Sequence, residues 1–146
     1  MHVFKNRCVM MVAMIATVLS VVSCSRAFII KPTGRIDQSV TFYFYESPNA
    51  DQPLKFNIVE LVVQEQKSDK EWITVWELNG ERSLEAITYG GKYEGLVERA
   101  PAKSLSPKAN YRVLAKDRPR FDPVGYSAVF FSFDESGALV ISGSPK

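Results

Sequence analysis

Glu94 and Glu98 are the pair of side chains whose types and spacing come closest to a catalytic site. Two carboxylates that converge on one bond can act as acid and base in glycoside hydrolysis. A spacing of four residues suits one face of a helix, but Gly95 lies between them and Pro101 follows, and both oppose a helix. The sequence does not fix the separation of the two carboxylates, so a carboxylate-based hydrolase is the least favoured of the possible functions.

Much other catalytic chemistry depends on histidine and cysteine, which are scarce in this chain, whereas chemistry by Lys, Tyr or Ser stays open. His2 is the single histidine, and Cys8 and Cys24 are the two cysteines. If residues 1–23 are removed, as argued next, the remaining chain keeps Cys24 and no histidine, which excludes Ser-His-Asp catalysis and His-ligated metal sites. The glycines of residues 89–95 lack the Gly-Lys-Ser/Thr ending of a phosphate loop, so we interpret them as a flexible turn. We therefore predict no catalytic residue, metal or cofactor.

The residues before Cys24 have the order of an export signal. Lys5 and Arg7 come first, with no acidic residue beside them, and the 14 residues from 9 to 22 carry no charge. This apolar run is too short to cross a bilayer as a helix, which takes about 20 residues. Ser23, a small residue, directly precedes Cys24. Residues 1–23 are therefore predicted to be a helical signal peptide.

The run Val21-Val22-Ser23-Cys24 resembles the lipobox of bacterial lipoproteins. The resemblance implies that a diacylglyceryl group is attached to the Cys24 sulfur and that residues 1–23 are then removed. Two or more acyl chains anchor a protein stably in a membrane. Ser25, rather than Asp, follows the cysteine, which implies an outer-membrane location facing the periplasm in a host that has an outer membrane. The alternative is an ordinary secretory signal with an incidental cysteine.

Length and charge describe the rest of the chain. Residues 24–146 suit a single domain, which we divide into a short lead (24–37) and a folded domain (38–146). Alternatively, Phe28-Ile29-Ile30 forms a first edge strand and shortens the lead. Without Lys5 and Arg7 the chain has 16 basic and 16 acidic side chains, so a nucleic-acid partner is not expected.

Short apolar-rich runs separated by turn signals predict an all-β domain without helices. Asn79-Gly80 predicts a tight turn, and residues 92–108 and 116–125 are predicted loops. This spacing suggests an antiparallel β-sandwich or a small barrel. The predicted strands are residues 39–46, 55–66, 71–78, 84–89, 111–115, 126–134 and 138–142.

One local pattern favours a particular kind of sandwich. Leu105, Pro107, Tyr111 and Val113 match the run Leu-x-Pro-x-x-x-Tyr-x-Val and resemble fibronectin type III domains. The resemblance implies an immunoglobulin-like fold in which the Tyr111 hydroxyl bonds back to the backbone, a tyrosine corner. Such a resemblance implies a fold and not an activity.

Two groups of residues are candidates for binding. Arg118, Arg120 and Phe121 lie in the 116–125 loop, and arginine and aromatic residues dominate binding hot spots. The alternative is a solvated loop stiffened by two prolines. A second group of aromatic residues is predicted to fill the core rather than to form an exposed stripe; its members are Tyr43, Tyr45, Trp72 and Trp76.

With no catalytic constellation, binding is the function that the sequence favours. We expect a lipid-anchored cell-envelope protein, held in the membrane through Cys24, whose small β-sandwich acts as a binding or adaptor module for another envelope protein. The alternatives are a periplasm-facing inhibitor or small-ligand carrier and the carboxylate-based hydrolase.

Overall fold

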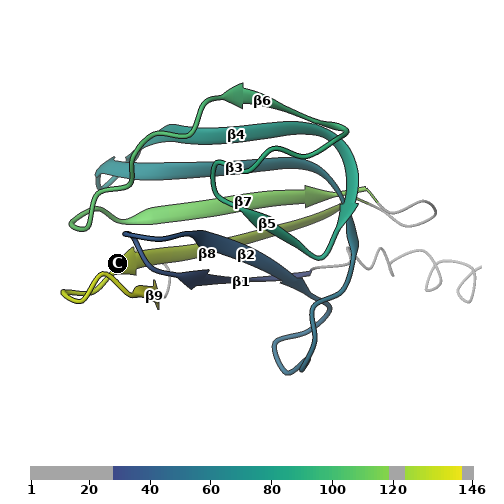
Figure 1. The fold of residues 1–146 in the computed structure, drawn as a ribbon, viewed down its shortest axis with the longest axis horizontal. Helices are drawn as coiled ribbons and strands as arrows, with labels where there is room; N and C mark the ends of the chain where they lie inside the picture. Colours follow the sequence, from purple (N-terminus) through teal and green to yellow (C-terminus); the bar gives the residue numbers. More distant parts are fainter. Residues whose placement is uncertain (1–27, 119–123, 143–146) are drawn as a thin grey trace, which may run out of the picture.

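The computed structural model describes residues 28–118 and 124–142. Within these residues the chain forms nine β-strands in two antiparallel sheets that pack face to face (Figure 1). The prediction of an all-β sandwich of antiparallel sheets is therefore confirmed. The signal peptide, Cys24, Arg120 and Phe121 lie outside the described residues.

Both sheets combine strands that are distant in sequence. The smaller has the order β1-β2-β5 and the larger the order β6-β4-β3-β7-β8-β9, with every neighbouring pair antiparallel. The three strands of the smaller sheet are β1 (Ile29–Gly34), β2 (Val40–Tyr45) and β5 (Ala86–Thr88). The six strands of the larger sheet are β3 (Phe56–Ser68), β4 (Glu71–Leu84), β6 (Leu96–Ala100), β7 (Tyr111–Asp117), β8 (Gly125–Phe133) and β9 (Leu139–Ser142).

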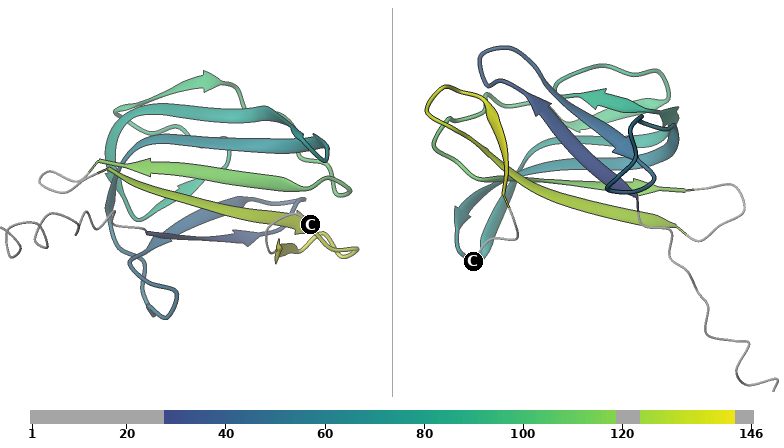
Figure 2. Two further views of the ribbon diagram at one scale, coloured as in Figure 1. Left: turned by 180° about the vertical axis from the view of Figure 1, so that it is seen from behind. Right: turned by 90° about the horizontal axis from the view of Figure 1, so that it is seen from below.

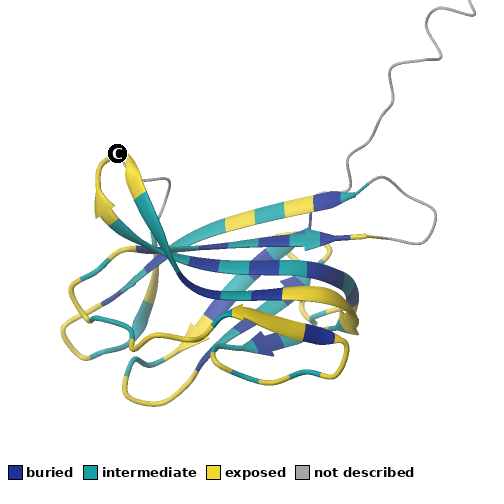
Figure 3. Cartoon of the chain, turned by 90° about the horizontal axis from the view of Figure 1, so that it is seen from above, coloured by how far each residue is buried: buried dark blue, intermediate teal, exposed yellow. Residues whose placement is uncertain are grey.

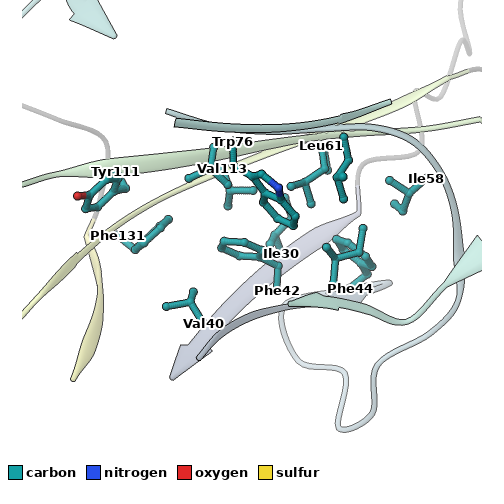
Figure 4. Close-up of a cluster of buried hydrophobic side chains, with 14 of the residues drawn as sticks. Ile30, Val40, Phe42, Phe44, Ile58, Leu61, Trp76, Tyr111, Val113 and Phe131 are labelled. Atoms are coloured by element: carbon teal, nitrogen blue, oxygen red, sulfur yellow. The ribbon is translucent and has the colours of Figure 1, made fainter. Parts of the chain in front are cut away.

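The core lies between the two sheets and is rich in aromatic rings. In β2, Val40, Phe42 and Phe44 are buried, as the period-two pattern predicts, while the residues between them are half-buried. Phe42 meets Phe131 of β8 across the core, with ring centroids 5.9 Å apart. Figure 4 shows these side chains between the sheets, together with Trp76 of β4. Burying each such ring contributes about 1.5–3 kcal/mol.

The predicted turn at Asn79-Gly80 is wrong, because β4 continues through it to Leu84. Gly80 has a φ of 154°, and a Cβ built on it would lie 2.1 Å from the Gly95 carbonyl oxygen. The glycine is needed there because the backbone that leads into β6 comes very close to β4. The prediction of a continuous loop over residues 92–108 is also wrong, because β6 occupies part of this range and pairs with β4.

The segment assigned to a lead, residues 24–37, contains strand β1. Phe28 and Ile30 are 1% and 3% exposed and belong to the core. The Phe28 ring stacks on Phe56 with a centroid distance of 5.0 Å and meets Phe44 edge-on. Among the described residues the sandwich therefore begins at Phe28, and the edge-strand alternative is confirmed for Ile29 and Ile30.

Tyr111 begins β7 and fastens the loop that precedes it. Its ring is fully buried and its hydroxyl oxygen accepts a hydrogen bond from the backbone N–H of Ser106 at 2.6 Å. Glu65 Oε2 lies 3.3 Å from the same hydroxyl and accepts a hydrogen bond from it. Burial raises the pKa of Tyr111 to about 12. The predicted hydrogen bond between the Tyr111 hydroxyl and the backbone is confirmed, and its partner is Ser106, five residues upstream.

Candidate binding surface

The side chains that alternate with the core residues of β3, β4, β7 and β8 form the outer sheet face. Strand register places Thr74 opposite Gln64, Gln64 opposite Arg112, and Arg112 opposite Phe130, which makes one row across four strands. All four residues are half-buried, whereas the residues next to them in β7 and β8, Tyr111 and Phe131, are fully buried. Figure 3 shows this alternation along the long strands.

An aromatic and cationic cluster forms where Trp72, which pairs with Gln66, meets the Arg112 and Phe130 side chains of this row. The Arg112 guanidinium carbon lies 4.4 Å from the centre of the Trp72 ring, and the Trp72 and Phe130 ring centroids are 5.8 Å apart. Arg112 Nε donates a hydrogen bond to Gln64 Oε1 at 2.7 Å, and Gln64 Nε2 donates to Thr74 Oγ1 at 3.3 Å. We call Trp72, Arg112 and Phe130 the Trp72 cluster. Its guanidinium is held in one orientation by a stacking contact and a hydrogen bond.

A depression of about 440 Å³ adjoins the Trp72 cluster on the same face. Val62, Leu114 and Ala128 lie opposite one another in the neighbouring row of β3, β7 and β8 and form its floor. One row further along, Tyr126 is 64% exposed, with the Lys116 ammonium 5.6 Å from its ring centre. The volume falls within the range of small-molecule pockets, about 300–1,000 Å³.

The side chains on the outer sheet face are suited to binding a partner or ligand. Half-buried tryptophan, arginine and phenylalanine side chains offer stacking area, charge and hydrogen-bond donors in one place, and these residue types dominate binding hot spots. The face joins them to an apolar depression that a partner side chain can fill. Among residues 28–118 and 124–142, no three His, Cys, Asp or Glu side chains are grouped as metal ligands.

The predicted binding loop is described only at its start. Arg118 is exposed, and its backbone is fixed by two hydrogen bonds with Asn57. The Arg118 N–H donates to the Asn57 carbonyl at 2.9 Å, and Asn57 Nδ2 donates to the Arg118 carbonyl at 2.9 Å. The structure therefore places Arg118 at the end of β7, away from the Trp72 cluster in the strand register.

The glycine-containing segment of residues 89–95 forms turns, as predicted. The Gly91 N–H donates to the Thr88 carbonyl at 2.9 Å, and the Tyr93 hydroxyl accepts from the Thr88 N–H at 2.6 Å. Tyr89 is also engaged, because its hydroxyl donates to the Lys103 carbonyl at 2.7 Å, and burial raises its pKa. These bonds hold the segment against the sandwich.

Glu94 and Glu98 line one depression, but each has a structural partner. Glu98 Oε1 accepts hydrogen bonds from Trp76 Nε1 at 3.0 Å and from the Ala102 N–H at 3.3 Å. The Glu94 side chain is 91% exposed and lies 3.9 Å from the Arg82 guanidinium. A general acid needs a carboxyl group that is shielded from water, and the solvated Glu94 does not supply one.

The four aromatic residues predicted for the core separate into two groups. Trp76 is fully buried and meets the Tyr89 ring edge-on at 5.0 Å, so the prediction is confirmed for this residue. It is wrong for Trp72, which lies on the outer sheet face, and Tyr43 and Tyr45 are half-buried on the outward positions of β2. The sequence of residues 111–117 could have predicted the outer sheet face. Arg112 and Leu114 alternate with the buried Tyr111 and Val113, so they point to the opposite side of the strand.

The described residues thus form a two-sheet β-sandwich with an aromatic and cationic surface on the outside of its larger sheet. Comparison with protein-family models, with curated proteins and with solved structures found no match. Within residues 28–118 and 124–142, no helix has the length and apolar character needed to cross a membrane.

Proposed function

We propose that this chain is a lipid-anchored cell-envelope protein whose sandwich binds another envelope protein through the outer sheet face. The observation that carries the proposal is the Trp72 cluster beside the apolar depression, where stacking, charge and apolar area meet on an open sheet surface. In the part of the chain that the structure describes, the outer side of this sheet is not covered by a helix or a third sheet. Figure 2 presents the sheet from two further sides.

The fibronectin-like assignment of the sandwich is part of this proposal. In immunoglobulin-type sandwiches, strands A, B and E share one sheet, and strands C, F and G the other. The pairing of β1, β2 and β5, and that of β3, β7 and β8, follow the same connections. The Tyr111 hydrogen bond to Ser106 at the entry to β7 adds support, because a tyrosine corner occurs at the corresponding strand.

The membrane anchor rests on the lipobox-like run that ends at Cys24. Cys24 would accept the diacylglyceryl group through its sulfur, and the domain would then be held at the membrane of the cell envelope. The mature chain contains no other thiol. Acylation at this position therefore explains a cysteine that no disulfide within residues 24–146 can use.

The side chains of the outer sheet face indicate what kind of partner surface it can bind. Arg112 directs its guanidinium along the sheet, where a carboxylate or carbonyl of the partner can accept its remaining donors. The floor formed by Val62, Leu114 and Ala128 suits one or two apolar side chains. We therefore infer a partner surface that carries apolar residues beside an acidic group.

Crosslinking in intact cells tests the proposal. A photoreactive phenylalanine analogue in place of Phe130 should yield a discrete crosslinked species, and the same analogue in place of Tyr43, on the opposite sheet, should not. Metabolic labelling with a palmitate analogue should mark the wild type and not Cys24→Ala. Equal labelling of both proteins, or equal crosslinking from both sheets, would contradict the proposal.

A small-ligand carrier is the second candidate, and the depression of about 440 Å³ favours it. An apolar ligand would lie on Val62 and Leu114 beneath the Tyr126 ring. Native mass spectrometry of the protein purified from its own membranes separates the two candidates. A bound small molecule lost in Leu114→Glu would support the carrier, and a ligand-free mass would exclude it.

A further inference from the structure

The chain enters the sandwich at a defined end. Strand β1 begins at Ile29, and the preceding Phe28 is packed between Phe44 and Phe56. Phe56 is the first residue of β3, and Ile58 of β3 pairs with Asp117 at the end of β7, so Phe28 lies where β7 ends and β8 begins. Figures 1 and 2 show the start of β1 at this end of the sandwich. We call this the entry end. From it, β1 runs to the opposite end of the sandwich, where Arg35 bridges to Ala138.

The distance along the chain between Cys24 and Phe28 is short. Three residues separate them. Fully extended backbone advances at most about 3.6 Å per residue, so the Cα atom of Cys24 lies within about 14 Å of that of Phe28. Because the Phe28 side chain is 1% exposed and held by two aromatic contacts, this end of the domain cannot move far from an acylated Cys24.

The entry end carries side chains suited to a membrane surface. Leu54 and Tyr126 are 44% and 64% exposed, and both are among the large apolar side chains that the described residues leave open to solvent. Leu54 is placed there by the hydrogen bond from its N–H to the Phe44 carbonyl at 2.9 Å. The Lys116 ammonium lies 5.6 Å from the centre of the Tyr126 ring, and Arg118 is exposed at the end of β7. Tyrosine rings and the long stems of basic residues favour the headgroup region of a bilayer.

We propose that the entry end rests on the membrane, with Leu54 and Tyr126 in the headgroup region and Arg118 beside lipid phosphates. The proposal rests on the lipid anchoring of Cys24 proposed above, and its partner is the lipid surface itself. The sandwich then stands on the bilayer with β1 directed away from it. In this orientation the Trp72 cluster faces sideways, open to a partner in the same membrane or beside it. The β8–β9 turn, which contains Ser136, is the part farthest from the lipid.

Fluorescence quenching in vesicles tests this orientation. The full-length acylated protein is reconstituted into phosphatidylethanolamine–phosphatidylglycerol vesicles that contain a nitroxide-labelled lipid. An environment-sensitive dye is attached to Leu54→Cys or to Val140→Cys, two positions that are both 44% exposed and lie at opposite ends of the sandwich. Because Cys24 carries the acyl group, each variant offers one thiol. We expect the nitroxide lipid to quench the dye at position 54 at least about threefold more than the dye at position 140.

Two results separate this inference from the anchoring on which it rests. If both dyes are quenched equally, or neither is, while palmitate labelling of Cys24 is intact, then the domain has no fixed orientation and the inference is overturned, although the anchoring stands. If palmitate labelling is absent, the anchoring itself fails. Stronger quenching of the dye at position 140 would overturn the orientation by reversing it. An added Tyr126→Asp substitution should reduce quenching at position 54, since the anionic phosphatidylglycerol surface repels a carboxylate.

Discussion

The two faces of the six-stranded sheet are built from the same strands and have opposite properties. Phe130 and Phe131 are adjacent in β8, yet Phe131 is fully buried against Phe42 and Tyr111, while Phe130 is half-buried against Trp72. The inner face consists of apolar rings that contact one another. The outer sheet face mixes aromatic rings with arginine, glutamine and threonine. The comparison indicates that stability depends mainly on the inner face, and the outer one is the face that we propose for binding.

The alternation of a strand explains how one short sequence serves both purposes. In β7, Tyr111, Val113 and Ala115 point into the core, and Arg112 and Leu114 point out. An inner residue that is shortened leaves a gap among neighbours on every side, because the interior is close-packed. An outer residue has such neighbours on one side, and water or a partner fills the space on the other. Substitutions on the two faces should therefore differ in size and in kind.

The largest effect is expected from Phe131→Ala. The ring contacts Phe42, Tyr111 and Phe133, and its removal leaves a cavity between the sheets. The free energy of unfolding should fall by about 3–5 kcal/mol, as for other buried phenylalanines. Urea denaturation, monitored by tryptophan fluorescence, measures this free energy. A loss below about 1 kcal/mol would contradict the assignment of this face to stability.

A smaller loss is expected from Tyr111→Phe, which removes one hydroxyl and keeps the ring. The Ser106 N–H loses its acceptor, and we expect a loss of about 0.5–1.5 kcal/mol, the net contribution of such a hydrogen bond. Denaturant midpoints of the variant and the wild type measure the difference. An unchanged midpoint would mean that the corner contributes nothing to stability.

Alkaline titration sharpens the role of Tyr111. Burial raises its pKa from 10.0 to about 12, so the unfolded chain loses this proton before the folded chain does. Stability should therefore be complete below pH 10 and decline as the pH rises from about 10 toward 12. Tyr89, whose pKa is also raised by burial, contributes in the same direction. Tyr111→Phe should lose less stability over this range than the wild type, and an equal decline would contradict the assignment.

Phe130→Ala is the matched substitution on the outer sheet face. It removes the same ring from the neighbouring residue, but this ring packs mainly against Trp72, with a centroid distance of 5.8 Å. We expect the free energy of unfolding to fall by about 0.5–1.5 kcal/mol, the value of an aromatic pair. The same urea measurement compares it with Phe131→Ala. If the two substitutions were equally destabilising, the outer sheet face would be part of the core.

The smallest effect on stability is expected from Tyr126→Ser. The ring is 64% exposed, and the Lys116 ammonium approaches its centre at 5.6 Å. Exposed substitutions of this kind usually stay within about 0.5 kcal/mol. Thermal unfolding should show a midpoint close to that of the wild type. A clear decrease would show that Tyr126 supports the sheet rather than binding a partner or lipid.

The fold was more predictable than the surface. The alternation of Val40, Phe42 and Phe44 identified a half-buried strand, and the resemblance of residues 105–113 to fibronectin type III domains predicted the hydrogen bond of Tyr111. The turn predicted at Gly80 was wrong, because a glycine that permits close backbone approach cannot be told from one that permits a turn by sequence alone. The local sequence did not distinguish a strand that bends from two strands joined by a turn.

The outer sheet face could not be assembled from the sequence, because it depends on register. Trp72 meets Arg112 and Phe130 only after β4, β3, β7 and β8 have paired, and these residues are far apart in the chain. The β3–β4 pair also contains a register shift between Val63 and Gln64, near the point where Val75 and Trp76 are both buried. Simple alternation does not reveal which tryptophan points outward. The predicted binding loop at residues 116–125 required no strand pairing, because its residues are consecutive, but residues 119–123 lie outside the described residues.

The central claim is that the outer sheet face, rather than the end of β7, binds the partner. Arg112→Ala and Arg118→Ala make the same chemical change at the two places and can be compared directly. Each variant carries the photoreactive phenylalanine analogue at position 130, and its folding is first checked by circular dichroism. In intact cells, Arg112→Ala should reduce the crosslinked species about tenfold, the equivalent of about 1.4 kcal/mol, while Arg118→Ala leaves it unchanged. A loss of crosslinking in Arg118→Ala, with Arg112→Ala at the wild-type level, would contradict the account.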